Sequence, residues 1–355
     1  MADVWHVNFS PAAKPAVGSS STLGWDVETQ LLMASRHCQG DPAPILAALA
    51  DSREAPPTPG SGRTTAVWEF LATLAGADLA AARTVEPHLD AAAILSHAGI
   101  GWQPGTTWGV FAAEGGANKP ATARQETPGA AWTLDGLKPW CSLAGTLDHA
   151  VVTAHVDGGR RAFAVDLRQA GVTAHSGSWE SHGLGRIPSE PVDFSGARAH
   201  PVGATNWYLD RPGFAVGGVG VAACWFGGAV GIYRTLFRSA QGREPDQLAR
   251  AWLGEADRLL ASGAALLREA ARDADDGTLT WETAQRVRGH IAETCERLLV
   301  LAGRALGPAP LGFDRDHARR VADLGIYIRQ HHSSRDDAAL GGLLLEDANG
   351  GTGRW

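Results

Sequence analysis

The order of helix-like and strand-like sequence patterns along this 355-residue chain constrains its fold most strongly. Residues 22–101 are rich in Ala and Leu at helical spacing, and a helical pattern returns from residue 213 onward. Between them, over about 106–205, short apolar runs alternate with Gly, Asp and Pro, which is typical of strands joined by turns. The pattern predicts an α+β fold with three domains: helical over 1–105, β over 106–205 and helical over 206–355.

Individual elements can be predicted within these three parts. The segments that indicate strands are WTLDG, AVVTAHV, RAFAVDL, GVTAHS and EPVDFSGARAHPVG. Asp135-Gly136 predicts a tight turn, and Trp140, Cys141 and Ser142 are expected on a strand or at its end. Long helices are predicted over 213–240, 244–273, 280–306 and 315–345, with a break at the Gly-Pro-Ala-Pro segment 307–310.

Composition excludes several classes of function. The net charge of −7 argues against nucleic-acid binding, which needs a positive surface. No membrane span is expected, on the reading that no apolar run reaches 18 residues, and the N-terminal residues lack the order of a signal peptide. The four cysteines lie far apart and form no CxxC pair, which favours reduced thiols in a cytoplasmic protein over a zinc site.

A known family shares several of these segments. LDGLKPWCS, at 134–142, resembles the L-N-G-x-K-x-W-I-[ST] segment of the acyl-CoA dehydrogenases and their flavin-dependent relatives. The segments at 148–154, 163–165, 171–173 and 212–231 match later elements of that family in the same order. The resemblance implies an N-terminal α-helical domain, a middle β-barrel-like domain and a C-terminal four-helix bundle. It also implies non-covalent FAD between the β domain and the last helices.

The resemblance assigns cofactor contacts residue by residue. Trp140 would pack against the flavin ring, and Ser142 would place a hydroxyl near its reactive edge. Cys141, between them, is expected among the cofactor-binding residues. The alternative for Trp140 is an ordinary core position. AEGGANKP, from Ala113 to Pro120, stands where relatives have T-E-P-G-A-G-S-D, and Ala113 replaces the Thr. Backbone contacts to the cofactor are therefore expected at Ala113 and at Ala112 before it, without the Thr hydroxyl.

Two further contacts lie in the C-terminal part. Arg304 stands where relatives have the Gln of Q-x-L-G-G, and its guanidinium suits a pyrophosphate. A solvated charge at a helix end is the alternative for Arg304. Ser333 stands at the hydroxyl residue that follows the family's catalytic Glu.

The chemistry depends on what replaces that Glu. Aligning Ile326-Tyr327 on the family's I-Y places His331 at the Glu, and a shift of one residue places Gln330 there. The second position that relatives use for Glu falls near Val221, so neither place offers a carboxylate. His331 is the candidate general base, since imidazole accepts protons near neutral pH. Ser333-x-x-Asp336 resembles a helix capping box, so Asp336 is expected to accept hydrogen bonds from backbone N–H groups. His331 and His332 are neighbours whose side chains point in different directions, which argues against a metal site.

Three functions follow from these substitutions. The first is α,β-dehydrogenation of an acyl thioester with hydride transfer to FAD, with an electron-transfer partner in some relatives. A flavin-dependent monooxygenase or oxidase is the second, and a non-catalytic subunit partnering an active paralogue is the third. A homodimer or homotetramer is expected through the C-terminal helices, because the 244–273 helix has more than one apolar face.

Overall fold

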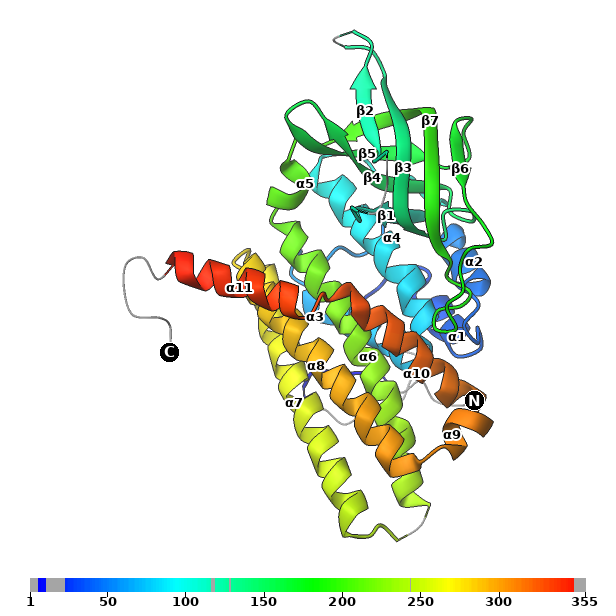
Figure 1. The fold of residues 1–355 in the computed structure, drawn as a ribbon, viewed down its shortest axis with the longest axis vertical. Coiled ribbons are helices and arrows are strands. Elements are labelled where there is room, and N and C mark those ends of the chain that lie inside the picture. The colour runs from blue at the N-terminus through cyan, green and yellow to red at the C-terminus, as the bar shows by residue number, and fades with distance from the viewer. Residues whose placement is uncertain (1–5, 11–22, 116–118, 128, 243, 348–355) are drawn as a thin grey trace.

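The fold places a sheet at one end of the molecule and a bundle of long helices at the other (Figure 1). The computed structural model describes residues 6–10, 23–115, 119–127, 129–242 and 244–347. The N-terminal helices are α1 (Glu28–Ser35), α2 (Ala43–Asp51), α3 (Thr64–Ala77) and α4 (Leu79–His97). Helix α4 begins where the Asp78 side chain accepts a hydrogen bond from the Ala80 N–H, and it packs against β1 and α6.

The strands of the middle part close on themselves. They are β1 (Trp108–Phe111), β2 (Thr122–Gln125), β3 (Trp132–Ser142), β4 (His149–Val156), β5 (Gly159–Asp166), β6 (Val172–Ala174) and β7 (Ser189–Val202). The order β4-β2-β3-β7-β5 returns to β4 through the β4–β5 pairing, while β1 joins β4 and β6 joins β7. All five strand segments predicted from sequence are strands, and their arrangement is barrel-like as the resemblance implies.

The turn predicted at Asp135-Gly136 was wrong, because β3 runs through it. The β3–β7 register shifts between Leu134 and Asp135, so the two residues form an irregularity inside the strand. Gly136 has φ +104°, and a Cβ there would lie 2.6 Å from the carbonyl oxygen of Pro120. A glycine is needed here because the backbone at Pro120 lies so close, and not because the strand turns into a hairpin.

The C-terminal part begins with the short helix α5 (Trp207–Asp210) and continues with long helices. These are α6 (Gly213–Gln241), α7 (Gln247–Asp275), α8 (Trp281–Leu306), α9 (Ala309–Phe313), α10 (Arg315–Tyr327), a 3₁₀ turn η1 (Ile328–Gln330) and α11 (Ser334–Asp347). The single helix predicted over 315–345 was wrong. His331 adopts an extended conformation and Ser333 has φ +51°, which separates α10 from α11.

Helix α6 is the core of the bundle. It packs against α3, α4, α7, α8 and α10. The expectation that no apolar run reaches 18 residues was wrong for α6, which is long and apolar enough to cross a membrane by length and composition. However, 78% of its most apolar window is buried inside the protein, as in the core helix of a globular domain.

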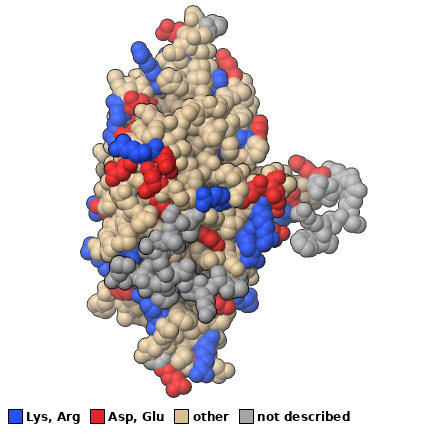
Figure 2. Space-filling view, turned by 180° about the vertical axis from the view of Figure 1, so that it is seen from behind, with Lys and Arg blue, Asp and Glu red and all other residues tan. Residues whose placement is uncertain are grey.

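Parts of the surface remain apolar. Leu248 on α7 is 60% exposed, Phe313 on α9 is 93% exposed and Leu345 on α11 is 75% exposed. Helix α11 extends away from the bundle (Figure 1), and on the face in Figure 2 basic and acidic side chains lie side by side in small groups.

The homo-oligomer and the domain limits at 105 and 205 stay predictions.

Candidate functional site

The end of β3 presents Trp140 to solvent. Its side chain is 61% exposed, and its backbone has φ +59°, a conformation that costs a bulky residue about 1–3 kcal/mol. The β3–β7 register shifts between Lys138 and Cys141, so Trp140 turns outward while Lys138 and Cys141 are buried. The Trp179 ring stands perpendicular to it at 6.4 Å. The alternative of Trp140 as a core residue was therefore wrong.

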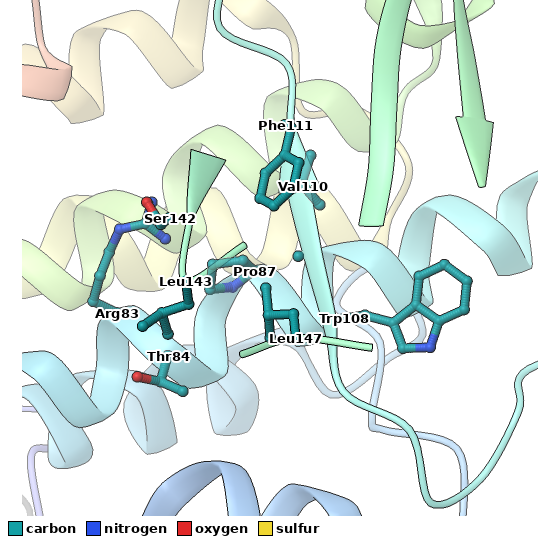
Figure 3. Close-up of a pocket in the computed structure, with 10 residues that line it drawn as sticks. Arg83, Thr84, Pro87, Trp108, Val110, Phe111, Ser142, Leu143 and Leu147 are labelled. Carbon is teal, nitrogen blue, oxygen red and sulfur yellow. The ribbon is translucent and has the colours of Figure 1, made fainter. Parts of the chain in front are cut away.

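Cys141 and Ser142 face inward beside Trp140. Burial raises the pKa of the Cys141 thiol to about 12, so this thiol stays protonated and serves in packing. The Ser142 hydroxyl accepts a hydrogen bond of 2.8 Å from Arg83 Nη2 and shares one of 2.6 Å with the Ser189 hydroxyl. Figure 3 shows the Arg83 guanidinium reaching Ser142 from α4.

Arg83 belongs to a buried polar cluster. Its Nη1 lies 3.7 Å from Glu86 Oε2, and the Tyr327 hydroxyl donates a hydrogen bond of 3.4 Å to the same oxygen. Burial raises the pKa of Glu86 to about 7, even though the charge of Arg83 lowers it. Near neutral pH this carboxyl group therefore populates both its protonated and its ionised form.

The loop after β1 is held by a second group of charges. Lys138 is 1% exposed, and its ammonium donates hydrogen bonds to Glu114 Oε1 at 2.7 Å and to Thr153 at 2.8 Å. Thr153 also contacts the carbonyl oxygen of Ala112 at 3.5 Å, while Ala113 is exposed. The loop is thus held by an ion pair in which Lys138 is buried and the Glu114 side chain is 30% exposed, and Ala113 offers backbone groups without a side-chain hydroxyl.

His331 lies elsewhere, between α8 and α11. It lines a cavity of about 510 Å³, to which Gly289, His290, Ser333 and Asp337 also contribute. Ser142 lines a different cavity, of about 10 Å³, with Arg83. The structure therefore does not bring the predicted base and the predicted cofactor hydroxyl into one cavity.

The surroundings of His331 keep its imidazole neutral. Burial lowers its pKa, Arg288 lowers it further, and Asp336 opposes both from 3.7 Å. The Ser333 N–H donates to His331 Nδ1 at 3.3 Å, so in the neutral ring the proton is assigned to Nε2, which faces Asp336. Gln330, the alternative base, has an exposed side chain.

Two remaining predictions concern α8 and α11. The Asp336 carboxylate accepts a hydrogen bond of 3.0 Å from the His332 N–H, so it does satisfy a backbone donor, one residue before the predicted Ser333. Arg304 is exposed in the last turn of α8, and its role as a pyrophosphate ligand stays a prediction.

Among the residues that the structure describes, no group of three or more His, Cys, Asp or Glu could hold a metal ion.

Arg288 links the two regions. Its guanidinium donates to the Gly218 carbonyl at 2.6 Å and to the Gln330 carbonyl at 3.2 Å, and it lies over the Trp225 ring at 4.9 Å. It contributes to the electrostatics of both Glu86 and His331. The start of the segment that carries His331 is thus tied to the bundle core.

Solved structures match this architecture over most of the chain. Butyryl-CoA dehydrogenase from Megasphaera elsdenii has a TM-score of 0.75 at 16% identity, covering 90% of this chain and 98% of that one. The chain has the acyl-CoA dehydrogenase fold. No family model and no curated protein matches its sequence.

Flavoproteins with this fold carry out more than one type of reaction. Glutaryl-CoA dehydrogenase from Mycobacterium smegmatis, in complex with FADH2, matches with a TM-score of 0.73 at 16% identity, covering 90% of this chain and 93% of that one. The dibenzothiophene monooxygenase TdsC from Paenibacillus sp. A11-2, with FMN and indole, matches with a TM-score of 0.71 at 19% identity, covering 91% and 96%. At these identities the comparisons show the fold.

The residues at the end of β3 fit a flavin. An exposed aromatic face suits a flat ring, and the Ser142 hydroxyl with the Arg83 guanidinium suits its polar edge. The small cavity lined by Ser142 does not hold a ring, so the ring would lie on the exposed Trp140 side. Sequence reasoning missed Arg83 and Glu86. Their signal was two opposite charges at i, i+3 within an Ala- and Leu-rich helix.

Proposed function

We propose that this chain is a flavin-dependent oxidoreductase that holds its cofactor against the end of β3. The observation that carries the proposal is Trp140, held exposed in a strained conformation next to the Ser142 hydroxyl. Strain of this kind is retained where a site needs the side chain in that place. FAD is the proposed form, with Arg304 as the residue for its pyrophosphate.

For the reaction, we propose α,β-dehydrogenation of an acyl thioester. A bound flavin supplies the hydride acceptor of a dehydrogenation or, once reduced, the activation of oxygen. His331 would take the α-proton at Nδ1 in place of the hydrogen bond that the Ser333 N–H donates there, and Asp336, 3.7 Å from Nε2, would stabilise the resulting imidazolium. The lowered pKa of His331 supports this role, because the base must be neutral before it accepts a proton.

Monooxygenation is the second candidate. Two observations favour it: no carboxylate stands at His331 or near Val221, and His331 lines a cavity separate from that of Ser142. An oxygen-dependent reaction does not need a base and the flavin edge to share an acyl pocket.

One experiment separates the candidates. The purified protein is loaded with FAD or FMN and mixed anaerobically with a set of acyl-CoA thioesters while the visible flavin band is followed. Loss of the band with enoyl product supports dehydrogenation. No bleaching, with oxygen-dependent product from an aromatic substrate once an external reductase supplies reduced flavin, supports monooxygenation. A protein that takes up neither flavin would be the non-catalytic subunit.

A further inference from the structure

Arg83 is bound closely to the Ser142 hydroxyl and only loosely to its counter-ion, Glu86. Its side chain is 12% exposed. Nη2 is committed to Ser142 at 2.8 Å, whereas the nearest contact to Glu86 is 3.7 Å, beyond a normal hydrogen bond. The positive charge therefore sits nearer to the Ser142 hydroxyl than to the carboxyl.

The charge of Glu86 is weakened by its surroundings. Burial is the largest influence and raises its pKa to about 7, and Asp90 on the same helix acts in the same direction. Arg83, the Tyr327 hydroxyl on α10 and Arg288 on α8 act in the opposite direction, and Cys224 on α6 stays a neutral thiol. Below about pH 7 most Glu86 is protonated, so Arg83 then carries an uncompensated charge.

The hydrogen bond also restricts the Ser142 hydroxyl. A hydroxyl has one proton and two acceptor lone pairs. Arg83 occupies one lone pair, and the Ser189 hydroxyl can occupy the second. When Ser189 is the donor of that shared hydrogen bond, the single proton of Ser142 is left free of both partners.

We propose that Arg83 is a positioning and charge-tuning residue for the flavin: it orients the Ser142 hydroxyl and stabilises the negative charge of the reduced ring. This rests on the proposed function, since it needs a flavin at the end of β3. A nearby positive charge stabilises the anionic reduced flavin more than the neutral oxidised flavin. Arg83 therefore makes the cofactor easier to reduce, and more so below pH 7.

The test measures the reduction potential of the bound flavin, by dye equilibration at pH 6.5, in the full-length protein. Arg83→Gln should weaken binding of reduced relative to oxidised flavin by tenfold or more, a drop of about 30 mV for a two-electron couple. Arg83→Lys keeps the charge and should retain most of the potential. The matched control is Arg211→Gln, which removes another buried arginine paired with an α4 carboxylate, Asp90, at 3.5 Å.

The outcomes separate this inference from the proposed function. A potential that is unchanged in Arg83→Gln, or that falls equally in Arg211→Gln, overturns the role of Arg83 while flavin binding stands. If Arg83→Gln does not fold, Ser142→Ala replaces it: this change should lower the potential by removing the oriented hydroxyl, and an unchanged potential overturns the role. A parent protein that binds no flavin contradicts the proposed function itself.

Discussion

Arg83 Nη2 and Ser142 Oγ are joined by a hydrogen bond of 2.8 Å, which ties the second turn of α4 to the last residue of β3. The N-terminal helices and the sheet therefore meet at the hydroxyl that the resemblance places beside the flavin edge. The same guanidinium lies 3.7 Å from Glu86 and over the Tyr327 ring at 5.6 Å. Three parts of the chain thus influence the charge at one proposed reactive edge.

Replacing Trp140 should separate cofactor binding from folding. In Trp140→Ala the affinity for flavin should fall about tenfold, the equivalent of about 1.4 kcal/mol, because aromatic stacking is lost. Trp140→Gly should fall similarly, yet raise the free energy of unfolding of the apoprotein by about 1 kcal/mol, since glycine tolerates φ +59°. Fluorescence titration and urea unfolding measure the two effects. Full flavin affinity in Trp140→Ala would contradict the stacking role.

Glu86 should make stability depend on pH. Its folded pKa of about 7 exceeds the ordinary 4.5, so the folded state retains a proton that the unfolded chain loses. Its contribution is fully present below about pH 4.5 and lost as pH rises to about 7, a change of about 3 kcal/mol in the free energy of unfolding. Glu86→Gln should remove this slope, as urea unfolding at pH 5 and pH 7.5 would show. Equal slopes in parent and variant would exclude the raised pKa.

His331 should control the pH profile of thioester oxidation. Because its pKa lies below the usual 6.5, turnover should rise with pH through a midpoint below that value. His331→Ala should keep flavin bound and lose about 100-fold in turnover, while His332→Ala, the neighbouring exposed histidine, should change it little. Stopped-flow reduction with the thioester measures both. A His331→Ala protein as fast as the parent would leave Gln330 or the monooxygenase as the better account.

Gly136 should be intolerant of any side chain. Gly136→Ala combines φ +104° with a Cβ that would lie 2.6 Å from the Pro120 carbonyl oxygen, so the free energy of unfolding should fall by about 2 kcal/mol or more. Gly129→Ala is the control: its φ is +88°, but a Cβ there meets no atom within 4 Å. Its cost should be about 1 kcal/mol, that of the backbone conformation alone. Equal losses in the two variants would show that the close approach does not matter.

Local patterns predicted the elements, and long-range contacts decided the exceptions. The five strand segments and the helices at 213–240, 244–273 and 280–306 follow from spacing and turn residues, which the sequence displays directly. The turn predicted at Asp135-Gly136 was wrong because the need for glycine comes from Pro120, just before β2, whose backbone lies against Gly136. The helical pattern over 315–345 likewise gave no sign of the break at His331. Long-range and local contacts stabilise this break: Arg288 donates to the Gln330 carbonyl, and the His332 N–H donates to Asp336.

The candidate site shows the same limit. The LDGLKPWCS segment placed Trp140 and Ser142 at a strand end, where the structure has them. Arg83 and Glu86 were missed, because only the packing of α4 against the sheet and α10 shows that these charges are buried beside Ser142. That His331 and Ser142 line different cavities could not be predicted either, since the His331 cavity is formed where α8 and α11 meet.

Titration of the purified, cofactor-stripped protein with FAD and with FMN, followed by quenching of flavin fluorescence, tests the central claim most directly. The account predicts saturable, one-to-one binding of flavin that is weakened by Trp140→Ala and unaffected by Trp281→Ala, a change at another exposed tryptophan, at the start of α8. Tighter binding of FAD than of FMN would support the proposed form of the cofactor. Binding of neither flavin, or equal binding by the parent and Trp140→Ala, would contradict a flavin site at the end of β3.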